Sequence, residues 1–198
     1  MKIPSHRRPH GFTLIELLVV IAIIAVLASA GFAAGNAAIQ KARKTTALAT
    51  ATAIESAVNN FYTEYGSMPD EGGSDTTVQT NNQIKLLNVL LGLEGTGSNV
   101  LNTRAIKFLS VREGKGNKNG LIYNTNGTSI QGLFDPWGGP FHVMLDLNYD
   151  EQLNIPGTVF NGGRTLNGRR VAVWSLGADA APGGTGGKKS DDVVTWGQ

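Results

Sequence analysis

The sequence predicts an α+β protein in which one long N-terminal helix packs against a small antiparallel sheet with long loops. Two observations lead to this fold class. No proline interrupts the chain from Phe12 to Tyr65, and apolar residues and alanine dominate that stretch. Beyond Tyr65 the chain is rich in glycine and carries short apolar segments bounded by turn residues. Because so small a sheet needs a helix to cover its apolar face, we expect the two regions to pack together.

The first part of the expected helix, residues 12–34, is apolar except for Glu16 and is long enough to cross a hydrocarbon core about 30 Å thick. Lys2, Arg7 and Arg8 precede it, and basic residues favour the cytoplasmic side of a membrane. The alternative is a cleaved signal peptide, but the apolar run continues directly into more helix and has no small-residue cleavage site at its end. The sequence therefore predicts a transmembrane helix over residues 12–34.

The second part, residues 35–65, is amphipathic. Its apolar residues are three or four positions apart, which places them on one face of a helix; they are Leu48, Ala51, Ile54, Val58, Phe61 and Tyr65. Together the two parts predict one helix of about 54 residues, with Gly31 and Gly35 as points where it bends or melts.

Glu16 is the one charge inside the apolar run. A carboxylate there costs roughly 2.5 to 3.5 kcal/mol on membrane-insertion scales, so an acid within a span is treated as a candidate functional residue. The alternative is a side chain near the helix end that reaches the lipid headgroups.

Residues 7–16, Arg-Arg-Pro-His-Gly-Phe-Thr-Leu-Ile-Glu, resemble the type IV prepilin leader shared by pilins and the pseudopilins of type II secretion. In that family a membrane aspartyl peptidase cuts after the glycine and methylates the new terminal amine. The resemblance implies a leader over residues 1–11, cleavage between Gly11 and Phe12, and N-methylation of Phe12. It also implies a pilin-like fold, in which Glu16 pairs with the terminal ammonium of a neighbouring subunit during assembly.

The remainder, residues 66–198, is expected to form a globular head outside the membrane. Residues 84–93 predict a short helix, and residues 103–111 fit a helix or a strand equally well. Strands are expected in three apolar or alternating segments, which are residues 121–123, 141–145 and 170–175.

Asp179 and Asp192 flank a glycine-rich segment that cannot form a core. Oxygen ligands on a flexible loop suit calcium, and the alternative is a pair of solvated surface acids. The motifs D-P-W-G at residues 135–138 and S-L-G-A-D at residues 175–179 are similar to the C-terminal half of the major pseudopilin of type II secretion, where two loop aspartates hold a structural calcium.

This second resemblance implies Asp179 and Asp192 as side-chain ligands, helped by the carbonyl of Leu176 and a backbone group near Ser190. The chain departs from the family pattern in two places. Ala180 stands where glycine is usual, and Lys188 with Lys189 stands where the loop is usually acidic.

A second acidic loop, residues 146–151, has the D-x-N-x-D spacing that begins some calcium loops, but it lacks the glycine and the acid expected later in such a loop. We expect a polar hairpin loop, with an ion site as the alternative and Asp150 as the residue to test.

Composition argues against catalysis and nucleic-acid binding. The chain has no cysteine, no nucleophile or phosphate-loop motif, and, once the leader is removed, one histidine, His142, which we expect in packing or at the surface. Without Lys2, Arg7 and Arg8, the 17 basic residues fall to 14 against 15 acidic ones, so the pI near 8.9 does not indicate an anionic partner.

The predicted function is therefore that of a structural subunit. The resemblance implies a pseudopilin of the bacterial inner membrane that assembles with itself into a periplasmic filament for type II secretion. Its implied partners are the prepilin peptidase, other pseudopilins and the inner-membrane secretion assembly proteins. The alternatives are a true type IV pilin for adhesion, motility or DNA uptake, and a binding module anchored by an uncleaved helix.

Overall fold

A computed structural model describes residues 12–82, 84–157, 163–183 and 191–197; the side chains of residues 30, 31, 33 and 34 are outside this description. The chain divides into two compact units, Met1–Lys41 and Ala42–Gln198. The expected leader, residues 1–11, is not among the described residues.

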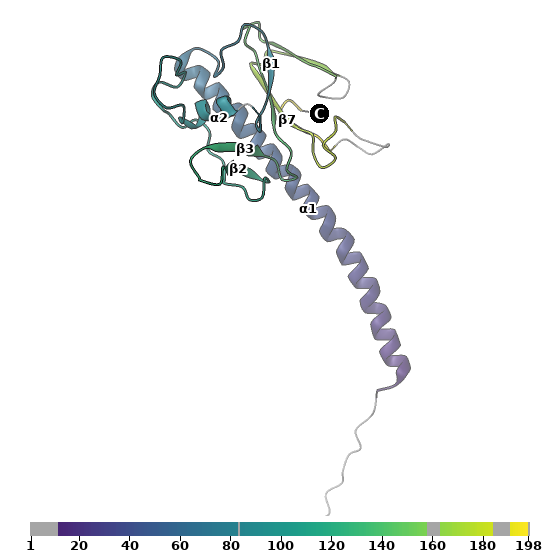
Figure 1. Cartoon of the computed structure of the whole chain (residues 1–198). Helices are drawn as coiled ribbons and strands as arrows, with labels where there is room; N and C mark the ends of the chain where they lie inside the picture. The colour runs from purple at the N-terminus through teal and green to yellow at the C-terminus, as the bar shows by residue number, and fades with distance from the viewer. Residues whose placement is uncertain (1–11, 83, 158–162, 184–190, 198) are drawn as a thin grey trace, which may run out of the picture. The chain divides into compact units, whose positions relative to one another are not determined.

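Helix α1 runs from Leu14 to Tyr65, which confirms one long N-terminal helix (Figure 1). It begins two residues later than expected and continues through Gly31 and Gly35, so the helix does not melt at these glycines. Among the residues that the structure describes, no helix is long and apolar enough to cross a membrane, and the transmembrane character expected for residues 12–34 is not confirmed.

The part of α1 in the second unit buries one stripe, which consists of Ala47, Ala51, Ile54, Ala57, Val58 and Phe61. Leu48 was expected in this stripe but is 44% exposed. The reason is helical geometry: Ala47 is four residues before Ala51 and shares its face, whereas one further residue turns Leu48 about 100° away.

Among its described residues, the second unit contains a short helix, α2 (Ile84–Leu91), and eight strands: β1 (Thr76–Gln79), β2 (Gly120–Tyr123), β3 (Ile130–Phe134), β4 (His142–Leu145), β5 (Gln152–Ile155), β6 (Arg164–Asn167), β7 (Val171–Ser175) and β8 (Val193–Val194). All pairings between these strands are antiparallel. The strands form one four-stranded sheet in the order β1-β4-β7-β8 and the two-stranded sheets β2-β3 and β5-β6, rather than one small sheet.

Helix α2 and strands β2, β4 and β7 confirm four of the expected elements. Residues 103–111 form neither a helix nor a strand. They are irregular, and the amides of Phe108 and Leu109 both donate to the carbonyl of Leu90, each at 2.9 Å. The acidic loop at residues 146–151 joins strands of different sheets, so it is not a hairpin loop as expected.

The four-stranded sheet has an apolar core on each face. On one face, Val143, Leu145, Val171 and Val173 pack with the buried stripe of α1 and with α2. On the other face, Met144, Ala172, Trp174 and Val194 pack with apolar residues of β5 and β6. Since side chains alternate along a strand, β4 and β7 supply both cores and are buried along their whole length.

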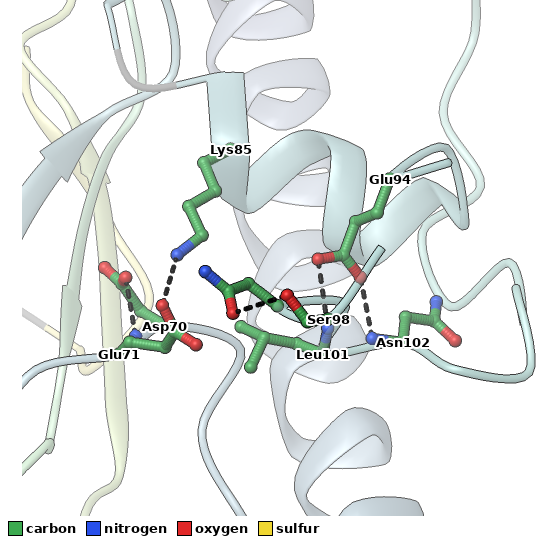
Figure 2. A network of polar contacts seen from close by, with 8 residues as sticks. Asp70, Glu71, Lys85, Glu94, Ser98, Leu101 and Asn102 are labelled. Atoms are coloured by element: carbon green, nitrogen blue, oxygen red, sulfur yellow. Dashed lines mark hydrogen bonds and ion pairs between the residues drawn. The ribbon is translucent and has the colours of Figure 1, made fainter. Parts of the chain in front are cut away.

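Hydrogen bonds that are buried or partly buried link residues 101–106 to α2 and to the turn that follows it, and Figure 2 shows those made by Glu94. The carboxylate of Glu94 accepts the amides of Leu101 at 3.1 Å and Asn102 at 2.6 Å. The side chain of Asn102 donates to the carbonyls of Val89 and Ile106 and accepts from the hydroxyl of Tyr65. These bonds satisfy backbone groups that no regular element pairs.

Candidate functional site

The start of α1 is a capping box formed by Thr13 and Glu16. Glu16 Oε2 accepts the backbone amide of Thr13 at 2.8 Å and its hydroxyl at 2.7 Å, and the amide of Glu16 donates to Thr13 Oγ1 at 3.3 Å. This exchange satisfies amides that a helix start leaves without partners. Phe12 is 81% exposed, and Gly11 lies outside the described residues.

Sequence reasoning assigned Glu16 a role in assembly but missed Thr13. The signal was present, because Thr-x-x-Glu before an apolar run is typical of a capping box. Both residues follow the expected cleavage point, so processing leaves the cap intact. Among the described residues, nothing donates a hydrogen bond to Glu16 Oε1, the second carboxylate oxygen.

The D-P-W-G motif forms a turn that closes on its own aspartate. Asp135 is buried, and its Oδ1 accepts the amides of Trp137, Gly138 and Gly139 at 2.8, 2.7 and 2.9 Å. Its Oδ2 accepts the hydroxyl of Ser175 at 2.6 Å. Ser175 opens the S-L-G-A-D motif, so one buried carboxylate joins the two segments that the resemblance singled out.

The loop after Ser175 closes on Asp191, a residue that sequence reasoning passed over. Asp191 Oδ2 accepts the amides of Ala178 at 2.6 Å and Asp179 at 3.3 Å. Gly177 has a φ of +70°, and a Cβ atom there would lie 2.7 Å from the carboxyl carbon of Asp191. Glycine is therefore required both by the backbone conformation and by the close approach of Asp191.

The two expected calcium ligands differ in burial. Asp192 is buried, with Oδ2 accepting the amide of Gly183 at 2.7 Å, whereas Asp179 is exposed, with Oδ1 accepting the amide of Ala181 at 3.0 Å. Leu176, three positions before Asp179, is half-buried, and Ser190 lies outside the described residues. The atoms that these residues offer as metal ligands are all oxygens, which fits the chemistry of calcium.

A second cluster of carboxylates is formed by residues that lie far apart in the sequence. Oxygens of Asp75, Asp146 and Asp150 lie within 4.8 Å of one another. In the register of β1 against β4, Thr76 pairs with Leu145. Asp75 precedes β1 and Asp146 follows β4, so strand pairing brings these two together. The sequence offered no local sign of Asp75, because this proximity depends on the pairing.

His142 is a packing residue, as expected. Its ring stacks on Trp174, with centroids 5.3 Å apart and an angle of 12° between the planes. Its Nδ1 is buried and has no hydrogen-bond partner among the described residues. Burial lowers the pKa of His142 below its ordinary 6.5, and the nearby charge of Asp135 opposes this shift.

Comparison with known proteins gives a consistent result. Residues 6–32 match the family model described as prokaryotic N-terminal methylation motif. The chain is 33% identical over 128 residues to prepilin peptidase-dependent protein D of Escherichia coli (strain K12), an alignment that covers 63% of this chain and 86% of that protein.

Two fimbrial proteins are also similar. Fimbrial protein EcpC of Eikenella corrodens is 30% identical over 124 residues, which cover 63% of this chain and 78% of that protein. A fimbrial protein of Neisseria meningitidis serogroup B is 38% identical over 77 residues, which cover 38% of this chain and 44% of that protein. No solved structure matches the chain.

Proposed function

Because the chain belongs to the type IV prepilin-like proteins, we propose that it is a pseudopilin, made as a precursor, processed by a prepilin peptidase and polymerised into a periplasmic filament for type II secretion. Cleavage falls between Gly11 and Phe12, and the new Phe12 amine is methylated. A relative named for its dependence on a prepilin peptidase supports the processing step.

One observation carries the assembly step: the first unit leaves its large apolar side chains exposed. They include Leu14, Ile15, Ile24, Leu27 and Phe32, each more than half exposed. A contiguous apolar surface of this kind marks a contact with lipid or with other protein. We infer that the precursor is held in the inner membrane by this surface and that the mature subunits pack it together in a filament.

Glu16 fits the same proposal. Its Oε2 caps its own helix through Thr13, which leaves Oε1 to accept the methylated amine of a neighbouring subunit. A carboxylate among apolar side chains gains most from such a pair, because few water molecules compete for it.

The test is expression of the full chain with a prepilin peptidase, followed by mass measurement, N-terminal sequencing and imaging of filaments. We expect an N-methylated phenylalanine start and filaments. Gly11→Leu should leave the precursor uncut. An intact Met1 in the membrane form of the natural chain would contradict processing and favour the anchored binding module.

Substitution of Glu16 separates its two roles. Glu16→Gln keeps an oxygen that can cap Thr13 but removes the charge, so we expect normal cleavage without filaments. Thr13→Val is the matched control, since it removes the hydroxyl of the cap and leaves the carboxylate. Filaments from Glu16→Gln equal in amount to those of the natural chain would refute the pairing.

A type IV pilin is the second candidate, and the fimbrial relatives favour it. The pseudopilin is preferred on the two C-terminal motifs, which Asp135 joins through Ser175. Deletion of the gene distinguishes them: loss of secreted enzymes with normal surface pili supports the pseudopilin, and loss of surface pili, twitching or DNA uptake supports the pilin.

We also propose the calcium site that the resemblance implies, with Asp179, Asp192, the Leu176 carbonyl and a group near Ser190 as ligands. Bound calcium would supply a fixed positive charge that holds the loop closed. Calcium should raise the melting temperature and protease resistance of the full chain in detergent, and Asp179→Ala should abolish the gain. No change with calcium in the natural chain would remove the proposal.

A further inference from the structure

The head carries a hollow lined by uncompensated cations. It has a volume of about 380 Å³, and Arg43, Arg112, Lys115 and Lys118 line it together with one acid, Glu113. All four cations are exposed. None of their side chains makes an ion pair or a hydrogen bond with the described residues. We call these four residues the basic hollow.

The same head carries a matching excess of negative charge. Asp75, Asp146 and Asp150, here called the acidic cluster, have carboxylate oxygens within 4.8 Å of one another and form no ion pair among the described residues. Asp146 is buried, and its carboxylate accepts the amides of Asp150 and Glu151. Asp150 is exposed and Asp75 is partly exposed, and like charges this close repel, so a cation brought against these two is stabilising. The neighbouring acids Glu71 and Glu151 already have partners, Lys85 and Arg170.

The two features lie far apart on the head. Arg43 belongs to the hollow, and Tyr62, nineteen positions later on the same helix, stands about 28 Å further along it. The ring of Tyr62 lies 6.3 Å from that of Tyr149, the residue before Asp150. A single head therefore cannot bring its own acidic cluster into its own hollow.

We propose that the basic hollow of one copy receives the acidic cluster of a second copy, head to tail. The inference rests on the proposed function, because it requires that the chain polymerises. Each copy supplies both surfaces in equal number, and a contact between two different surfaces repeats into a filament rather than stopping at a dimer. Such complementarity fixes the orientation of the partner and excludes the reversed contact, in which like charges would meet.

Charge favours a second copy over a lipid surface as the occupant. The mature chain is nearly neutral, with 14 basic residues left of 17 once Lys2, Arg7 and Arg8 are removed, against 15 acidic ones. Its charges are separated into two surfaces rather than gathered into one basic face, as binding to an anionic membrane favours.

Cross-linking tests the contact without background, because the chain has no cysteine. We would place Lys118→Cys and Asp150→Cys in one full chain, assemble it with a prepilin peptidase present and add a short bis-maleimide. Lys118 and Asp150 are both exposed. A ladder of covalent multimers is expected. The matched control pairs Asp150→Cys with Lys107→Cys, which is exposed and lies outside the hollow.

A charge exchange provides the second test. Lys118→Glu alone and Asp150→Lys alone should each lose most of the sedimenting filament, and the two together should restore it. Lys107→Glu, with the same change of charge, should assemble normally. Unchanged melting temperatures would show that the single variants still fold.

The outcomes separate the two proposals. If the natural chain forms no filament, the proposed function fails. If it forms filaments but gives no ladder beyond that of the control, or if the exchange does not restore assembly, the head-to-tail contact is overturned. It is equally overturned if Lys118→Glu assembles normally and instead loses binding to phosphatidylglycerol vesicles.

Discussion

The boundary between the two units divides helix α1 into two parts that differ in the burial of their apolar side chains. In residues 14–41 the large apolar residues point outward all round the helix, and Phe32 is 81% exposed. In residues 42–65 one stripe is buried, and Phe61 is completely inaccessible. The second part packs its stripe within its own unit, whereas the large apolar side chains described in the first part remain exposed.

The largest effect expected from this comparison is on Phe61. Its ring lies 4.7 Å from Tyr65 and 5.4 Å from Phe108, so Phe61→Ala should cost about 3–5 kcal/mol in free energy of unfolding. Denaturant titration of the full chain in detergent measures it. The matched control, Phe32→Ala, should change the stability by less than about 0.5 kcal/mol. Equal losses would mean that both parts of α1 are buried alike.

A smaller loss is expected where polar contacts stabilise the head alone. Asp135→Ala removes the acceptor of three amides and of the Ser175 hydroxyl, which should cost about 2–3 kcal/mol. Thermal unfolding in the presence of a chelator measures this. Asp179→Ala is the control, since Asp179 is exposed and should matter little without calcium. A normal melting temperature for Asp135→Ala would contradict the structural role of the motif.

A gain of stability is expected at Ala180. Its φ of +53° lies in the left-handed region, where a Cβ atom is unfavourable. Ala180→Gly should therefore stabilise the head by about 1 kcal/mol. Ala181→Gly, one residue later and without a positive φ, should instead be neutral or slightly destabilising. The gain should appear in thermal unfolding of the head and leave the helicity of residues 14–41 unchanged.

The smallest effect concerns pH. Because burial lowers the pKa of His142 in the folded chain, the unfolded chain binds its proton first as pH falls below 6.5. Stability is full above pH 6.5 and decreases toward the lowered folded pKa. As the pH is lowered through this window, the melting temperature of the natural chain should fall. The melting temperature of the His142→Gln variant should fall less. An identical decrease in both chains would assign it to other groups.

The sequence predicts what local patterns determine. The length of α1, the burial of its second part and the strands β4 and β7 follow from spacing and apolar runs. Strands such as β1 (Thr-Thr-Val-Gln) and β6 (Arg-Thr-Leu-Asn) were missed because each buries a single side chain and is defined by its pairing. The proximity of Asp75 to Asp146 has the same cause. Thr13 is different, since its capping pattern with Glu16 is legible in the sequence.

The order of the four-stranded sheet bears on how the head folds. Strands β1, β4, β7 and β8 are neighbours in the same order in which they occur along the chain. Each can therefore join the free edge left by its predecessor as the chain is synthesised, and no finished strand has to open for a later one. Until β8 arrives, however, β7 presents an unpaired edge with five buried-type residues. The last two-residue strand thus ends the period in which the nascent head is most exposed to aggregation.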